Sequence, residues 1–341
     1  MDDHELAAGV DEIAADVGFS GVVRIDLEGR AAVERAYGFA DRGRRIANTA
    51  DTRFAIASGS KTFTALAVMA LVDDGVVELA TTARSLLGDD LPLIDDRVTI
   101  EQLLAHRSGI GDYLDEDEVV DMTDHVLTVP VHTLVETDDF LTVLDGHPMK
   151  SEPDARFTYC NGGYIVLALL AERAAGVPFH DLVDERVFRP AGLIDTAYRR
   201  TDETHDRMAF GYLHPEGLQT NVLHLPVRPN GDGGASTTTT DVHRFWDALF
   251  DGRIVSSASV EAMVEPRSPA ADVGMSYGLG CWIDDITGAV TMIGGDAGVG
   301  CFSSRDRSSG TTITVLGNQT RGTWPTGRRV TELIAGTHDQ G

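Results

Sequence analysis

Apolar and polar positions follow two different periodicities along this chain, and they distinguish its ends from its centre. Residues 5–17 have the spacing of an amphipathic helix, and residues 20–26 and 31–37 alternate as strands do. The centre is largely helical and is interrupted by proline and glycine. Residues 276–283, 289–293 and 311–316 again have the pattern of short strands, and 330–335 that of a closing helix. Strands at both ends with helices between them predict an α+β fold, in which one antiparallel sheet is built from both chain ends.

The apolar helical run at residues 63–71 follows a serine and a lysine three positions apart, Ser58 and Lys61. The 341 residues include only one other lysine, Lys150. Residues three apart share a face of a helical turn, so the amine can reach the hydroxyl if a helix begins here. A desolvated lysine can lose its proton near neutral pH, whereas arginine cannot. Ser58 and Lys61 are therefore a candidate nucleophile and its base, and the start of a helix would favour an oxyanion beside them.

A second candidate group is Tyr159-Cys160-Asn161, which leads into the turn-forming Gly162-Gly163. A tyrosine beside a lysine ammonium can take on phenolate character and pass protons to a leaving group. The amide of Asn161 can contact the lysine with one face and a substrate carbonyl with the other. Taken alone, the segment is better explained as a core tyrosine before a turn. Its position after Ser58 and Lys61 favours the catalytic interpretation.

In combination, these motifs resemble the serine β-lactamase-related family, which includes class C β-lactamases, D-alanyl-D-alanine carboxypeptidases, D-aminopeptidases and β-lactamase-like esterases. The resemblance covers most of the chain and includes four further stretches, at residues 103–109, 190–196, 233–241 and 277–280. It implies a β-lactamase/transpeptidase-like fold with the catalytic cleft between sheet and helices. We expect residues 1–68 and 230–341 to form the sheet region and residues 69–229 the mostly helical region. The resemblance further implies acyl-enzyme formation on Ser58, with Lys61 and Tyr159 as catalytic partners.

The third active-site element of the family, Lys or His followed by a small residue and glycine, departs from the pattern here. By position its equivalent is Ile293-Gly294-Gly295, followed by Asp296. The glycines would let the backbone approach the substrate closely. By resemblance, the N–H groups of Ser58 and Asp296 would form the oxyanion hole. An isoleucine cannot bind a substrate carboxylate, which favours small carboxylic esters as substrates. The alternatives are a D-aminopeptidase, D-alanyl carboxypeptidase or β-lactamase, or a catalytically weak binding or scaffold relative.

The composition of the chain limits the kinds of molecule that it can bind. The net charge of −26 disfavours nucleic acid and anionic membrane surfaces. No run of eighteen apolar residues is present, and the acidic start of the chain lacks the basic and apolar regions of a signal peptide, so we expect a cytoplasmic protein. Three cysteines lack metal-site spacing and are expected to be free core thiols. We therefore expect a small ester, amide or lactam as the substrate and no cofactor or metal; the sequence leaves the oligomeric state open.

Overall fold

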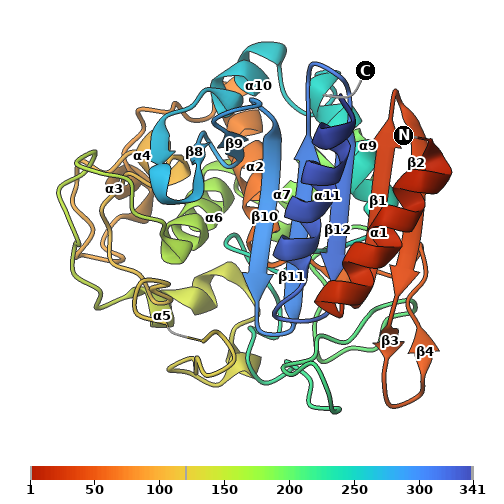
Figure 1. The fold of residues 1–341 in the computed structure, drawn as a ribbon. Helices are drawn as coiled ribbons and strands as arrows, with labels where there is room; N and C mark the ends of the chain where they lie inside the picture. The colour runs from red at the N-terminus through yellow and green to blue at the C-terminus, as the bar shows by residue number, and fades with distance from the viewer. Residues whose placement is uncertain (1, 120, 339–341) are drawn as a thin grey trace.

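A computed structural model describes residues 2–119 and 121–338. Its largest sheet has eight strands in the order β2-β1-β12-β11-β10-β9-β8-β7, and every pairing in it is antiparallel. The strands come from both ends of the chain, as predicted (Figure 1). Their bounds are β1 Gly21–Leu27, β2 Arg30–Tyr37, β7 Ser268–Ala270, β8 Met275–Tyr277, β9 Trp282–Asp284, β10 Val290–Asp296, β11 Val299–Arg305 and β12 Thr312–Gly317.

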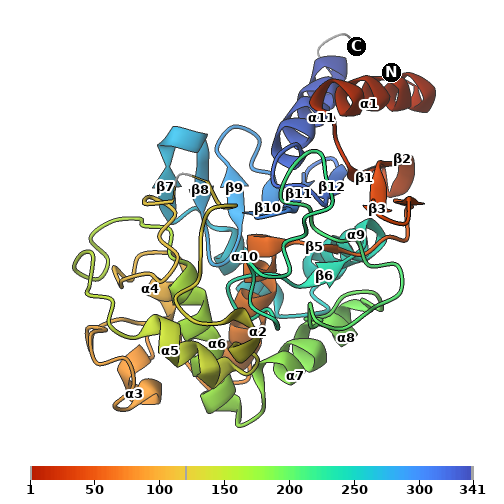
Figure 2. The same ribbon diagram turned by 90° about the horizontal axis from the view of Figure 1, so that it is seen from below.

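Helices cover both faces of this sheet (Figure 2). The terminal helices α1 (Asp3–Val17) and α11 (Thr323–His338) pack together on one face, over apolar side chains such as Val23, Phe302 and Val315. The other face packs against a larger core that includes side chains of α2 (Lys61–Asp73), α6 (Asn161–Ala175) and α9 (Thr239–Phe250). Successive residues of a strand point to opposite faces, so each sheet position belongs to one core or the other.

The remaining elements are short. The helices are α3 Ala83–Leu87, α4 Ile100–Leu104, α5 Leu141–Leu144, α7 Phe179–Val183, α8 Arg189–Ala191 and α10 Ser257–Val264. Two further strand pairs are β3 (Phe39–Asp41) with β4 (Ile46–Ala47), and β5 (Phe54–Ala55) with β6 (Ser236–Thr237). In the described part of the chain no single helix is long and apolar enough to cross a membrane; α6 and the following helical segment Phe179–Ala191 meet that test only as a pair bent by 84°.

Two predicted elements differ from the structure, and one observed strand was not predicted. Residues 276–283 form two strands, because the backbone reverses between Gly278 and Cys281, where the Gly278 N–H donates to the Cys281 carbonyl at 2.9 Å. Strand β11, whose polar half carries two serines and an arginine, has no counterpart in the prediction. The closing helix spans Thr323–His338 rather than 330–335. The division into a sheet region and a helical region at residues 68 and 230 stays a prediction.

Candidate active site

Ser58 lies in a single 3-10 turn, Ala57–Ser60, and the α-helix α2 begins only at Lys61. This corrects the expectation that a helix starts at the serine. Contacts with the segment before β6 hold the turn: the Gly234 N–H donates to the Ala57 carbonyl at 3.0 Å, and the Ala235 N–H to Ser60 Oγ at 2.9 Å. Ala57 has a φ of 44°, a left-handed conformation that disfavours residues with a Cβ. The turn presents Ser58 in partly exposed form at the base of a cavity.

Lys61 is only 1% exposed, and its amine contacts three oxygen atoms. Nζ lies 2.9 Å from Ser58 Oγ, 2.8 Å from Asn161 Oδ1 and 2.6 Å from the carbonyl oxygen of Asp232. Burial lowers the pKa of Lys61, although the carboxylates of Asp232 and Glu116 act in the opposite direction. A neutral amine would donate to Asn161 and Asp232 and keep its lone pair for the serine hydroxyl proton. The geometry therefore suits Lys61 as the base.

Tyr159 lies beside this pair, with its ring centroid 5.0 Å from Lys61 Nζ. The ring stacks on Trp282 and tilts against His106, at centroid distances of 6.2 and 4.3 Å. Burial, followed by the carboxylate of Glu116, raises the pKa of Tyr159 well above 10, and a hydrogen bond with Ser58 opposes this only in part. Burial therefore disfavours the phenolate character that the sequence suggested. A protonated Tyr159 is suited to donate its proton to a leaving group.

Asn161 opens α6, and its amide is fully used within the protein. Oδ1 accepts from Lys61, as the sequence predicted, whereas Nδ2 donates to the Leu114 carbonyl and to Glu116 Oε1, both at 3.0 Å. Its backbone N–H donates to Asp112 Oδ2 at 2.6 Å. The predicted contact with a substrate carbonyl is therefore not available to Nδ2 in this arrangement. Asn161 positions the lysine.

Ile293 does not face the candidate site, contrary to the prediction. It pairs directly with Phe302 of β11, and cross-strand partners share a face of the sheet. Phe302 packs under α11, where its ring lies 5.6 Å from that of Trp324, so Ile293 belongs to the face opposite Ser58. The β10 residues that line the cavity are Gly295 and Asp296, and neither is cationic. The prediction that this strand offers no cation to the site therefore still holds, but it holds for Gly295 and Asp296 and not for Ile293.

Gly294 explains why β10 needs glycine here. A Cβ at this position would lie 2.0 Å from the Ile56 carbonyl oxygen and 3.0 Å from the Ser58 nitrogen, so the strand could not pack against the serine turn. A Cβ on Gly295 would meet nothing within 4 Å. The close backbone approach predicted for both glycines is thus required only of Gly294.

Two acidic residues of the site, Asp232 and Glu116, escaped the sequence prediction, whereas Asp296 was predicted through its N–H group. Asp232 accepts from Lys61 through its carbonyl oxygen and from the Tyr113 hydroxyl, at 2.5 Å, through its carboxylate. Glu116 and Asp296 line the same cavity. Glu116 belongs to the acidic run at residues 115–118, which has the composition of a solvated surface. Asp232 lies in the segment Gly231-Asp232-Gly233-Gly234, whose glycines indicate a loop and not a buried charge. Only the fold brings these acids to Lys61.

The cavity beside Ser58 has a volume of about 710 Å³. It extends from the serine past β5 and β6 toward residues 199–211 and 220–226. Apolar side chains make up much of the wall, among them Phe54, Met122, Leu127, Met208, Phe210 and Leu225. Such a cavity can hold a small molecule with an apolar body and a few polar groups.

A serine held against a buried lysine, in a cleft between an antiparallel sheet and helices, defines an acyl-transferring serine hydrolase. The family model described as "Beta-lactamase" matches residues 6–335. The chain belongs to the β-lactamase family. It is 25% identical to the putative penicillin-binding protein PbpX of Bacillus subtilis, over 89% of this chain and 71% of that protein. It is 28% identical to a D-aminopeptidase of Brucella anthropi, over 77% of this chain but only 48% of that protein, so it spans about half the length of that relative.

Two solved structures show the same fold over nearly the whole chain. A penicillin-binding protein from Bacillus halodurans has a TM-score of 0.89 at 33% identity and covers 95% of this chain and 99% of its own. A D-amino acid amidase from Ochrobactrum anthropi has a TM-score of 0.81 at 25% identity and covers 98% of this chain and 99% of its own. The expected β-lactamase/transpeptidase-like fold is confirmed.

Asp296 gives a pH-dependent prediction. Burial, with the nearby carboxylates of Asp232 and Glu116, raises its pKa from 3.8 to about 7. Ionising Asp296 therefore destabilises the folded state, an effect that is absent below about pH 4, grows as the pH rises and is complete above about pH 7. Asp296→Asn should raise the melting temperature relative to wild type at pH 8, and the difference should vanish near pH 4. An equal difference at both pH values would show that Asp296 is not the titrating group.

Proposed function

We propose that the protein hydrolyses small carboxylic esters through an acyl-enzyme on Ser58. The observation that carries this proposal is the 2.9 Å contact between Ser58 Oγ and the buried amine of Lys61. Its burial favours the neutral amine, which can take the hydroxyl proton as Ser58 attacks the ester carbonyl.

The remaining steps use groups around that pair. The N–H of Ser58 and an N–H at the open end of β10, at Asp296, would stabilise the oxyanion. Tyr159, which keeps its proton, would protonate the leaving alkoxide. Water then attacks the acyl-enzyme carbonyl with the same groups in reversed roles and releases the carboxylic acid and Ser58. In this scheme Asn161 and the Asp232 carbonyl hold Lys61 in line with the hydroxyl.

The absence of a cation on the cavity-facing part of β10 supports esters over β-lactams and carboxypeptidase substrates. Those substrates carry a carboxylate near the scissile bond, and β10 presents Asp296 to the cavity where a cation would be needed to bind it. The D-aminopeptidase and D-amino acid amidase relatives favour amides as the second candidate. Nitrocefin and D-alanyl peptide amides distinguish β-lactamase and amidase activity from esterase activity. Efficient turnover of either substrate would place that activity ahead of ester hydrolysis.

We expect wild-type protein to release p-nitrophenol from p-nitrophenyl acetate and butyrate, and Ser58→Ala to lose this activity. A fluorophosphonate probe should label Ser58, which mass spectrometry of the modified peptide would locate. The Ser58→Ala protein, with a matched melting temperature, is the control for background hydrolysis. A wild-type protein that is neither labelled nor active would instead support a binding or scaffold role.

A further inference from the structure

Arg199 differs from the other arginines that line the cavity beside Ser58. Arg44, Arg200 and Arg207 each have a carboxylate within 4.0 Å, whereas the described residues provide none to Arg199. Its only side-chain hydrogen bond in the described part of the chain is a long one, 3.4 Å from Nη1 to Ser236 Oγ. A guanidinium has five N–H donors, so most of this donor capacity is available to a ligand.

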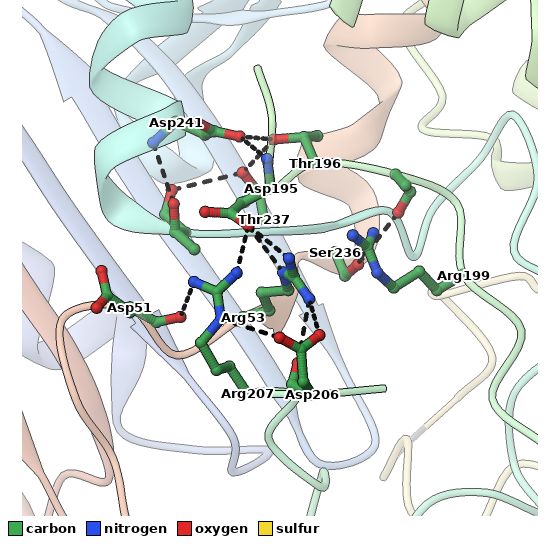
Figure 3. Close-up of polar contacts among 12 residues, drawn as sticks. Asp51, Arg53, Asp195, Thr196, Arg199, Asp206, Arg207, Ser236, Thr237 and Asp241 are labelled. Atoms are coloured by element: carbon green, nitrogen blue, oxygen red, sulfur yellow. Dashed lines mark hydrogen bonds and ion pairs between the residues drawn. The ribbon is translucent and has the colours of Figure 1, made fainter. Parts of the chain in front are cut away.

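The acids nearest to Arg199 are already engaged with other arginines (Figure 3). Asp195 lies 2.5 Å from Arg53 and 2.7 Å from Arg207, and Asp206 lies 2.7 Å from Arg53. Two arginines and two aspartates balance one another, so this cluster leaves the charge of Arg199 uncompensated. Partial burial, followed by the positive charge of Arg53, lowers the pKa of Arg199, and the carboxylates of Asp195 and Asp206 oppose this only in part.

The position of Arg199 relative to the nucleophile follows from the strand pair β5–β6. Ser236, which accepts from Arg199, pairs directly with Ala55, and Ala55 precedes Ser58 by three residues. Paired residues are about 5 Å apart and three residues span at most about 10 Å, so with the 3.4 Å hydrogen bond the guanidinium lies at most about 18 Å from the serine. We take a separation on the order of 10 Å, within this limit, to choose the substrate length.

Arg199 also lies on a particular side of Ser58. The described residues that line the cavity include Arg199 and Ser58 but neither Tyr159 nor its stacking partner Trp282. Tyr159 is the donor to the leaving group in the proposed mechanism, so the cavity extends on the other side, where the acyl chain would lie. Asp296 and Glu116 line the serine end of the cavity. Asp202 and Asp206, which line the cavity with Arg199, are already paired, Asp202 with Arg200 and Asp206 with Arg53 and Arg207.

We propose that Arg199 is the anchor for a carboxylate at the far end of the acyl chain, so that the preferred substrates are monoesters of medium-length dicarboxylic acids. This specificity rests on the proposed esterase function. We argued above that a carboxylate next to the scissile bond is disfavoured. The carboxylate that Arg199 would bind lies several carbons from that bond, so the two statements agree. An acyl chain of about six carbons bridges the estimated distance when hydrogen-bond lengths at both ends are included.

The kinetic test compares mono(4-nitrophenyl) adipate with its methyl-capped form, which has the same chain without the charge. We expect wild type to favour the anion in kcat/KM, and Arg199→Gln to reduce the anion-to-neutral ratio about 10- to 100-fold, the range for a hydrogen-bonded charge pair shielded from water. Arg199→Lys should retain part of the preference. The control is Arg186→Gln, because Arg186 is paired with Asp74 at 2.6 Å and is not among the described residues that line the cavity, so the ratio should stay as in wild type.

A binding measurement separates this proposal from the esterase function. Isothermal titration with adipate itself needs no turnover, and we expect at least tenfold weaker binding to Arg199→Gln than to wild type or Arg186→Gln. Adipate binding that depends on Arg199 in a protein without Ser58-dependent ester hydrolysis would refute the esterase function alone. Equal adipate affinity and equal substrate ratios in wild type and Arg199→Gln, with melting temperatures matched, would refute the anchor.

Discussion

Replacing Lys61 with arginine should reduce kcat/KM for p-nitrophenyl butyrate by about a thousandfold or more. The substitution keeps a positive charge and much of the volume, but a guanidinium stays protonated and cannot accept the Ser58 proton. The larger planar head must also fit where Nζ now contacts Ser58, Asn161 and Asp232. Loss of the base and displacement of Ser58 would both lower kcat/KM.

The chain supplies a matched control for this experiment. Lys150, the other lysine, forms an ion pair with Asp115 at 2.6 Å, which arginine can also form. Lys150→Arg should therefore keep kcat/KM within a few-fold of wild type. Ester turnover by Lys61→Arg near the wild-type rate would show that Lys61 is structural rather than the base.

The second large effect is expected at Gly294. In Gly294→Ala the new methyl group would meet the Ile56 carbonyl oxygen at 2.0 Å and the Gly59 nitrogen at 2.8 Å, and both are backbone atoms that cannot rotate away. Strand β10 must then separate from the turn that carries Ser58. We expect about 1–3 kcal/mol of lost stability, as for other overpacked sites. Catalysis should fall at least about 100-fold, because small misplacements of reacting groups have effects of that size.

Gly295→Ala is the stability control for this substitution, since its methyl group would enter open space. Its melting temperature should match that of wild type, whereas Gly294→Ala should melt several degrees lower. Two equally stable variants would mean that β10 and the serine turn do not pack as closely as the structure shows.

The sequence anticipated the parts of this protein that depend on local pattern. Alternation and helical periodicity placed α1, β1, β2, α2 and β12 close to their observed positions, because burial of one face imposes those periods on any chain. The scarcity of lysine singled out Lys61, and motif spacing joined it to Ser58, Tyr159 and Asn161. Those four residues do meet, although burial disfavours the phenolate form of the tyrosine.

What the sequence could not determine depends on contacts between distant segments. The face on which Ile293 lies is fixed by its register with Phe302, and a shift of one residue would reverse it. The acidic surroundings of Lys61 come from Asp232 and Glu116, which are far from it in the chain and unremarkable until the fold buries them. Arg199 looks like any other arginine until pairing among its neighbours leaves it without a carboxylate. Sequence pattern determined which groups are available for chemistry, whereas the tertiary structure decided their charge balance and direction, because desolvation and register arise only when separate segments pack together.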